Sequence, residues 1–279
     1  MVRQFTRLTG RALTLWLLML LASLSGKAWA KTVVTLAPHL TEWVYSLNAQ
    51  ENLLAVSAYS DFPAEAQNLP VVADYHGVDF KAIMQLNPDV ILAWQGGNKP
   101  QDIARLKSLG FDVFLSSPHK VDDIASEINQ LGKLLGRETL AASLTTSFSR
   151  QLKDLQHQYA DQPAISAFYY VWTQPLMSIG PDAWASELLK QCNVYGIFDD
   201  APTAYPEVTV QEVLRRQPNV LIAATDRPVE SEQTFWQPHR TVLGAPVYSV
   251  DPDVFSRFTL RLPAKLEQLC HRLHDTSAR

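Results

Sequence analysis

The sequence contains none of four motifs that mark common catalytic and nucleotide-binding sites. The nucleophile elbow GxSxG, a Walker A phosphate loop, the metalloprotease pair HExxH and the dinucleotide-binding GxGxxG are all absent. Each motif builds one defined geometry around a nucleophile, a phosphate or a metal ion. Their absence favours a protein that is not an enzyme. An exported hydrolase of small substrates stays an alternative, and it requires a nucleophile and a base that the fold brings together.

Long apolar runs are missing after residue 30. Three arginines precede an apolar stretch over residues 12–24, and residues 28–30 read Ala-Trp-Ala, with the small residues of a cleavage site. This pattern predicts a secretory signal peptide over residues 1–30 and a mature chain from Lys31. No later segment reaches the roughly 20 apolar residues of a membrane-spanning helix. We therefore expect an exported chain that does not itself cross a membrane.

Positive charge is also scarce in the predicted mature chain. Four of the 24 Lys and Arg residues lie in the first 30 residues, which leaves 20 against 28 Asp and Glu and a net charge of −8. A negative chain without a basic patch is not expected to bind nucleic acid. The remaining 249 residues suffice for one large domain or two smaller ones.

Cysteine is nearly absent, with only Cys192 and Cys270. In an exported protein an even pair favours a disulfide over two free thiols. Neither cysteine stands in a glycine-rich or histidine-flanked setting, so cysteine catalysis is the weaker interpretation.

Short apolar runs alternate with helical stretches, which indicates an α/β fold with parallel sheets. Residues 136–160 contain no proline and carry apolar residues three and four positions apart, which predicts one long helix. An internal echo, IMQLNPDVILAW against VLRRQPNVLIAA, supports two lobes. We expect a signal peptide over 1–30, an N-terminal lobe over 31–135, a connecting helix over 136–161 and a C-terminal lobe over 162–279. The predicted strands cover residues 33–37, 53–57, 90–94, 113–117, 167–172, 220–224 and 247–250.

Aromatic residues gather near the predicted strand ends. Trp94 closes a buried strand in LAWQGGN, where ligands of open α/β sheets bind, and Gly96 and Gly97 allow the backbone to approach a ligand. Rigid aromatic rings suit the binding of a bulky ligand by contact area. The other members of this group are Tyr59, Phe62, Tyr75, Trp172, Tyr205 and Phe255.

Histidines provide a second hypothesis. His39, His76 and His119 lie in predicted loops or after predicted strands, and Asp251 or Asp253 supplies a carboxylate for a zinc or manganese site. The competing interpretation is that all three histidines face solvent, and we favour it because no histidine-rich or acidic loop gathers metal.

Four segments together resemble a known family, the periplasmic cobalamin (vitamin B12) binding proteins of ABC importers, which belong to the helix-backboned solute-binding proteins. They are VVTLAPHLTE, AYSDFPAEAQ, IMQLNPDVILAWQGGN and the late pair LLKQC and LEQLC. The first pattern is shared with binding proteins for siderophores, haem and metals, whereas YSDFP and AWQGGN are the cobalamin-like part. The resemblance covers nearly the whole predicted mature chain.

The resemblance implies two α/β lobes joined by a single long helix, with the ligand in the cleft between them. It also implies a monomer that needs no cofactor or metal, carries cobalamin as cargo and docks on the permease subunits of the importer. The family's disulfide maps onto Cys192 and Cys270, in agreement with the cysteine count. Carried over by position, the ligand-binding residues are Tyr59, Tyr75, Trp94, Tyr205, Asp253 and Arg257.

Some positions depart from the family pattern. Tyr75 and Tyr205 stand where a relative has tryptophans, and His76 is placed to donate an axial nitrogen to cobalt. The surface glutamates that meet the permease align with Lys81 and Gln211, so the neighbouring Asp79 and Glu212 become the candidate docking residues. The interpretation is a cobalamin-binding protein, with a binding protein of the same fold for haem, a ferric siderophore, zinc or manganese as the alternative.

Overall fold

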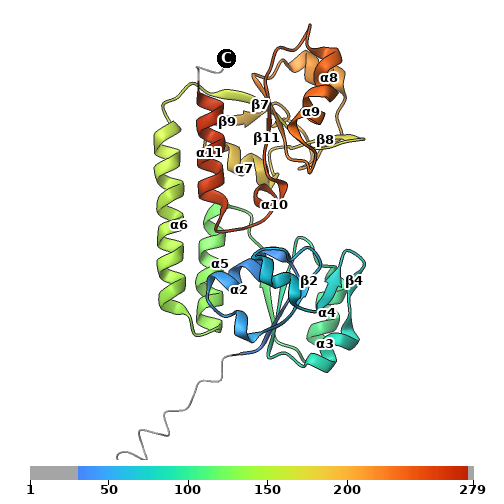
Figure 1. Ribbon diagram of the computed structural model, residues 1–279, viewed down its shortest axis with the longest axis vertical. Helices are drawn as coiled ribbons and strands as arrows, with labels where there is room; N and C mark the ends of the chain where they lie inside the picture. The colour runs from blue at the N-terminus through green and yellow to red at the C-terminus, as the bar shows by residue number, and fades with distance from the viewer. Residues whose placement is uncertain (1–30, 276–279) are drawn as a thin grey trace, which may run out of the picture. The chain divides into compact units, whose positions relative to one another are not determined.

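The computed structural model describes residues 31–275 (Figure 1). The predicted signal peptide of residues 1–30 and the final residues 276–279 lie outside the described part. From Lys31 onward the chain forms one compact unit. No helix within residues 31–275 combines the length and the apolar character needed to cross a membrane.

The N-terminal lobe is built on a six-stranded sheet in the order β4-β3-β2-β1-β5-β6. Its apolar inner strands are buried on both faces, as expected for parallel strands covered by helices. Three helices accompany it, and two of them, α2 and α4, begin with proline, which suits the first helical turn. The elements are β1 (Val33–Thr35), α2 (Pro38–Ser46), η1 (Gln50–Asn52), β2 (Leu53–Ser57), η2 (Ala64–Asn68), β3 (Val71–Asp74), β4 (Gly77–Val78), α3 (Phe80–Leu86), β5 (Val90–Trp94), α4 (Pro100–Ser108) and β6 (Val113–Ser116).

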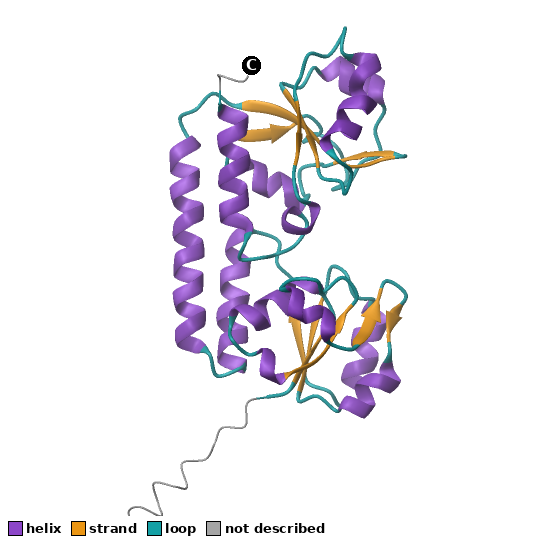
Figure 2. Cartoon of the chain, in the orientation of Figure 1, coloured by secondary structure: helices purple, strands orange, loops and turns teal. Residues whose placement is uncertain are grey.

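The C-terminal lobe contains a five-stranded sheet in the order β11-β10-β7-β8, with β9 paired to β7. Figure 2 shows helices beside both sheets. The elements are β7 (Ile165–Thr173), β8 (Leu176–Ser178), α7 (Trp184–Lys190), β9 (Val194–Gly196), α8 (Val210–Arg216), β10 (Val220–Ala223), α9 (Val229–Trp236), η3 (Gln237–His239), β11 (Val247–Ser249), α10 (Pro252–Phe255) and α11 (Leu262–His274).

The central strands of both sheets are parallel, as expected, and each sheet also has an antiparallel edge strand. β4 pairs antiparallel with β3, and β8 pairs antiparallel with β7. In each case only two residues separate the paired strands, and so short a connection joins antiparallel neighbours. All seven predicted strands are present, and the two antiparallel edge strands were not predicted.

The predicted long helix is confirmed as α6 (Glu138–Tyr159), which begins two residues later than expected. Gly136 has φ +66°, so the chain turns there before the helix starts. A second helix, α5 (Val121–Leu134), packs against α6, and Gly132 permits the close approach, because a Cβ there would lie 2.4 Å from Cβ of Ala141. Helix α11 also contacts α6 (Figure 2). The fold is therefore two α/β lobes with one long connecting helix, whereas the exact lobe boundaries stay a prediction.

The internal echo is confirmed in three dimensions. Helices α3 and α8 each contain seven residues, end at a left-handed residue, Asn87 or Gln217, and lead through a proline into the buried strands β5 and β10. The predicted disulfide is also present, joining Cys192 to Cys270 in α11 with 5.2 Å between their Cα atoms.

Candidate functional site

The predicted ligand-binding residues lie mostly where strands end. Tyr59 follows β2, Tyr75 lies in the β3–β4 turn and Trp94 is the last residue of β5. Asp253 and Arg257 follow β11, and Tyr205 precedes α8. The carboxyl ends of parallel strands form the ligand-binding edge of an open α/β sheet, so this placement agrees with the prediction while leaving each residue's contact with a ligand a prediction.

Four large aromatic side chains in this region are exposed to solvent. The exposed fractions are 72% for Tyr59, 76% for Tyr75, 59% for Trp172 and 49% for Tyr205. Exposed apolar surface of this kind often marks a binding site. Phe255 is an exception to the prediction, because it is only 4% exposed and belongs to the hydrophobic core.

Trp94 is half-buried, and its indole lies close to the two glycines that follow it. A Cβ on Gly97 would lie 2.1 Å from Cε3 of Trp94, and one on Gly96 would lie 2.8 Å from its indole nitrogen. Both glycines are needed because the indole lies against their backbone. The Trp94 ring also meets Phe258 edge-on, with 5.6 Å between ring centroids.

His39 is buried in α2, which corrects its assignment to a solvent-facing loop. Its ring packs edge-on against Trp43, Trp94 and Phe258, with centroids 5.1 to 5.5 Å apart. Burial, together with the nearby charge of Arg257, lowers the pKa of His39 to about 3. His39 is therefore a neutral core residue at physiological pH.

The three histidines of the metal hypothesis do not come together. Within residues 31–275, no group of three or more His, Cys, Asp or Glu side chains is arranged to hold a metal ion. The His76 ring contacts the Tyr75 ring at a tilt of 39°, with 3.8 Å between ring centroids, and His119 lies 3.2 Å from the Ser117 hydroxyl. The described chain thus offers no geometry for the zinc or manganese alternative.

A serine close to His39 bears on the hydrolase alternative. The Ser116 hydroxyl lies 3.3 Å from Nε2 of His39 and donates a hydrogen bond of 2.5 Å to Glu127. Ser116 and His39 are both buried. A substrate therefore does not reach Ser116. The Ser116 hydroxyl donates its hydrogen bond to the Glu127 carboxylate and not to the His39 imidazole.

Arg257 is held by three carboxylates. Its guanidinium lies 2.6 Å from Asp61, 2.6 Å from Asp253 and 3.5 Å from Glu42. The hydrogen bond from Arg257 lowers the pKa of Asp61 below its usual value. Arg257 and Asp253 therefore bind each other, and the arginine also connects the C-terminal lobe to the N-terminal lobe.

Glu42 is the centre of a second connection between the lobes. The Glu42 carboxylate, 3% exposed, accepts hydrogen bonds from Arg261 at 2.7 and 3.0 Å and from the Thr259 hydroxyl at 2.5 Å. The indole N–H of Trp43 donates to the carbonyl of Phe258 at 2.6 Å. We name Glu42, Asp61, Arg257 and Arg261 the inter-lobe charge cluster.

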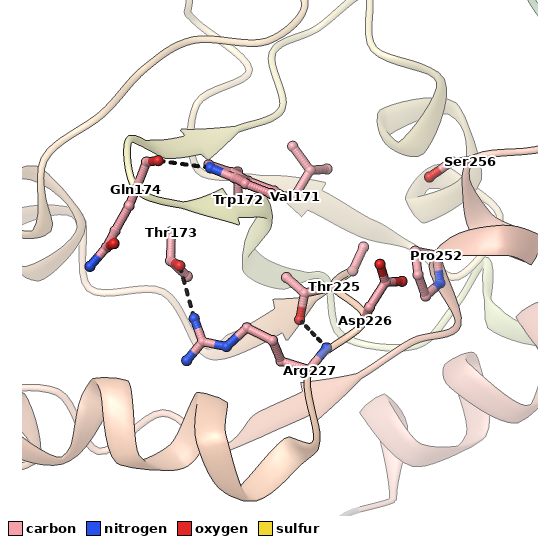
Figure 3. Close-up of a pocket in the computed structure, with 10 residues that line it drawn as sticks. Val171, Trp172, Thr173, Gln174, Thr225, Asp226, Arg227, Pro252 and Ser256 are labelled. Atoms are coloured by element: carbon pink, nitrogen blue, oxygen red, sulfur yellow. Dashed lines mark hydrogen bonds between the residues drawn. The ribbon is translucent and has the colours of Figure 1, made fainter. Parts of the chain in front are cut away.

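A cavity of about 540 Å³ lies in the C-terminal lobe at the ends of β7 and β10 (Figure 3). Trp172 forms part of its wall, and its indole N–H donates to the carbonyl of Gln174 at 2.8 Å. Asp226 and Arg227 lie on the loop after β10. This size falls in the range of about 300 to 1,000 Å³ that is typical of small-molecule sites.

The two candidate docking residues lie at equivalent helices, with Asp79 exposed before α3 and Glu212 half-buried in α8, and they differ in their pairing. The Asp79 carboxylate accepts the backbone N–H of Ala82 and caps α3. Glu212 in α8 forms ion pairs with Arg215 at 2.5 Å and Arg216 at 2.7 Å, and these hydrogen bonds lower its pKa to about 2. The charge of Glu212 is therefore largely balanced by its own helix.

Sequence reasoning missed Glu42, Asp61 and Asp226 as part of this region. Asp61 stands within the YSDFP segment already singled out, and Asp226 follows a predicted strand, so both had a local signal. Glu42 ends the VVTLAPHLTE segment, but its pairing had no local signal, because its partners lie more than 200 residues away in the sequence.

The chain is similar to several known proteins. Residues 33–237 match the profile of the family described as "Periplasmic binding protein". The chain is 35% identical over 261 residues to the vitamin B12-binding protein of Pectobacterium carotovorum, which covers 92% of this chain and 94% of that one.

Solved structures share this fold. The crystal structure of the periplasmic vitamin B12 binding protein BtuF of Vibrio cholerae superposes with a TM-score of 0.82 at 31% identity, covering 90% of this chain and 99% of that one. A periplasmic heme binding protein from Pseudomonas aeruginosa gives a TM-score of 0.79 at 18% identity over 88% of this chain and 94% of its own, which supports a shared fold alone.

Proposed function

Because the chain belongs to the periplasmic binding protein family, we propose that it captures vitamin B12 (cobalamin) and delivers it to the permease subunits of an ABC importer. The vitamin B12-binding protein of Pectobacterium carotovorum is similar over almost the full length of this chain. We also propose that residues 1–30 act as a cleaved signal peptide and that the delivered protein acts as a periplasmic monomer.

The observation that carries this proposal is the set of exposed aromatic side chains at the strand ends. Large ring surfaces are accessible on Tyr59, Tyr75, Trp172 and Tyr205. The half-buried Trp94 also lies at a strand end, as the last residue of β5. A bulky, flat ligand such as a corrin is well suited to this surface, since flat contact area needs no charge on the ligand.

The charge of the region favours cobalamin over the haem and ferric-siderophore alternatives. Both alternatives are commonly anionic and need unpaired cations in the site. Each arginine here is already paired with a carboxylate, and the carboxylates outnumber the arginines: Arg227, Arg257 and Arg261 against Glu42, Asp61, Asp226, Glu232 and Asp253. An anionic ligand would lose hydration without gaining an unpaired partner.

A rigid pair of lobes supports reversible binding without catalysis. The inter-lobe charge cluster fixes the two lobes before the ligand arrives, which lowers the ordering cost of association. No serine accessible to substrate is paired with His39, and the protein is proposed to act without a cofactor, metal or nucleic acid.

His76 gives a finer hypothesis about the bound state. Its ring contacts the exposed Tyr75 ring at a tilt in the β3–β4 turn, and we propose that it lies close enough to the corrin to donate an axial nitrogen to cobalt. The expected result is a shift of the cobalt absorption bands of aquocobalamin on binding, which His76→Ala abolishes. An unchanged spectrum on binding overturns this hypothesis.

Docking on the permease is proposed to use Asp79 and Glu212 on the equivalent helices α3 and α8. Because Arg215 and Arg216 balance Glu212, we expect Asp79 to contribute more attraction to a basic permease surface than Glu212. The comparison of Asp79→Ala with Glu212→Ala in stimulation of the reconstituted importer's ATPase tests this order.

The test of the proposed function is a calorimetric titration of the exported protein with cyanocobalamin, repeated with a strong chelator. We expect one tight site that the chelator does not change. Binding that disappears with the chelator supports the metal alternative, and saturable binding of haem without binding of cyanocobalamin supports the haem alternative. Either result refutes the proposal.

A further inference from the structure

We infer that the cavity beside Trp172 is a subsite for the carboxamide-bearing rim of the cargo, and that Asp226 makes it reject a rim that carries carboxylates. This inference rests on the proposed function and deepens it, because it assigns selectivity to residues that the predicted ligand set does not contain. It concerns one part of the C-terminal lobe, at the ends of β7 and β10 (Figure 3).

Trp172 provides a flat, fixed wall for this subsite. Its side chain is 59% exposed although it belongs to β7, so the fold does not use it as core. The hydrogen bond from its indole N–H to the Gln174 carbonyl fixes the ring orientation before any ligand arrives. A pre-oriented indole loses little freedom on binding, and its face remains available for a flat ligand.

Arg227 supplies donors to the subsite but no net charge. Its guanidinium donates to the Thr173 hydroxyl at 2.9 Å, and its Nε lies 3.3 Å from the fully buried carboxylate of Glu232. That carboxylate also accepts hydrogen bonds from Thr225 and Tyr170, both at 2.8 Å. Arg227 therefore neutralises a buried acid, while it also lines the cavity and keeps further N–H groups that suit a neutral carbonyl oxygen.

Asp226 supplies the matching acceptor and carries the unbalanced charge. It is exposed, and no hydrogen-bond or ion-pair partner is found for it within residues 31–275. Asp226 therefore makes this lip of the cavity negative, so a carboxylate on the cargo is repelled.

These groups together match a rim that carries several primary carboxamides. Figure 3 shows the Arg227 guanidinium and the Asp226 carboxylate on opposite sides of the cavity, so the carbonyl oxygen of one carboxamide accepts from Arg227 and the NH2 group of another donates to Asp226. Gln174 and Ser256 extend the same mixed lining. A carboxylate in the same place accepts but does not donate, so it leaves Asp226 facing another negative group. The rim of cobalamin bears propionamides, which the subsite fits, whereas the propionates of haem do not.

The test compares cyanocobalamin with its monocarboxylic acids, in each of which one peripheral propionamide is hydrolysed. The exported wild-type protein is titrated with all four ligands at constant salt, taking the b-, d- and e-acids as the three. We expect at least one acid to bind tenfold or more weakly than cyanocobalamin. In Asp226→Asn, the ratio for that acid should fall at least fivefold, because the repelling charge is gone while an acceptor oxygen remains.

A Trp172 variant separates the contribution of the aromatic wall from that of the Asp226 charge. Trp172→Ala should weaken cyanocobalamin tenfold or more without changing the acid-to-amide ratio. The matched controls are Asp182→Asn and Tyr195→Ala, exposed residues of the same lobe outside the cavity, and both should bind all ligands as the wild type does. Circular dichroism verifies the fold of each variant.

The outcomes distinguish a failure of the proposed function from a failure of the subsite alone. If the wild type does not bind cyanocobalamin, the proposed function is refuted and this subsite with it. If the wild type binds cyanocobalamin tightly but discriminates against none of the acids, or if Asp226→Asn leaves the ratio unchanged, the subsite alone is refuted.

Discussion

Glu42→Gln is the perturbation that best tests how the lobes are held together. The substitution keeps the size of the side chain but replaces one carboxylate oxygen with an NH2 group. One oxygen can still accept from Thr259 and from Nε of Arg261. The new NH2 group then faces Nη2 of Arg261 and Nη1 of Arg257, which are donors at 2.7 and 3.5 Å from the present oxygen.

The expected cost follows from burial. Glu42 is 3% exposed, and Arg261 is also held over the Phe62 ring at 4.0 Å, so the arginine cannot easily turn to solvent. Breaking a buried ion pair by removing one partner costs about 3 to 5 kcal/mol in unfolding free energy. For a chain of this size, each kcal/mol lowers the melting temperature by about 2 to 4 °C. We therefore expect Glu42→Gln to melt roughly 6 to 20 °C below the wild type.

A matched control is available in the same protein. Glu51 also pairs with an arginine, Arg137, at 3.3 Å, but Glu51 is 70% exposed. An exposed pair contributes about 0 to 1 kcal/mol, so Glu51→Gln should melt near the wild type. Urea denaturation and calorimetric melting of the three proteins give the comparison. Equal losses for Glu42→Gln and Glu51→Gln, or a loss below about 1 kcal/mol for Glu42→Gln, would refute the assignment of the cluster as a buried connection.

Three further predictions use the same protein. The pKa of His39 is about 3 in the folded state against 6.5 in the unfolded state, so the unfolded chain binds more protons between these pH values. The free energy of unfolding should therefore fall by about 1.4 kcal/mol for each pH unit as the pH drops through this window. His39→Gln should lose this slope in urea titrations. Replacing Cys192 and Cys270 by serine should lower the unfolding free energy by about 2 to 5 kcal/mol with cyanocobalamin binding retained, and unchanged stability would contradict this. Gly97→Ala should displace the Trp94 indole and alter the near-ultraviolet circular dichroism, because the added Cβ would lie 2.1 Å from the ring; an unchanged spectrum would show that the contact is not rigid.

The strands and long helix were predictable because their signal is local. β2 and β5 have the predicted bounds, since each is a run of apolar residues flanked by polar or turn-forming residues. β4 and β8 contain two and three residues, too few for any period to appear, and their pairing depends on the neighbouring strand. Short edge strands of this kind follow from tertiary contacts and not from their own sequence.

The candidate site was predictable in its location but not in its pairings. Aromatic residues at strand ends could be recognised one by one, and Tyr59, Tyr75 and Trp172 are exposed as a ligand surface requires. The pairing of Arg257 with Asp61 could not be recognised, because the two residues lie 196 positions apart. Burial of His39 was missed for the same reason, since Phe258, on the other lobe, helps to cover it.

These long-range pairings change what the predicted site residues do before cargo binds. Arg257 was expected to contact the ligand, yet it already satisfies Asp61 and Asp253, so a ligand gains from it only through donors that these carboxylates leave free. Affinity must then come from surface that is not paired in the structure, which is the exposed aromatic rings and Asp226. If the proposed function holds, a site whose arginines are paired with carboxylates is expected to select its cargo by shape and by neutral hydrogen-bonding groups, and this would distinguish a carboxamide-rich corrin from an anionic haem or ferric siderophore.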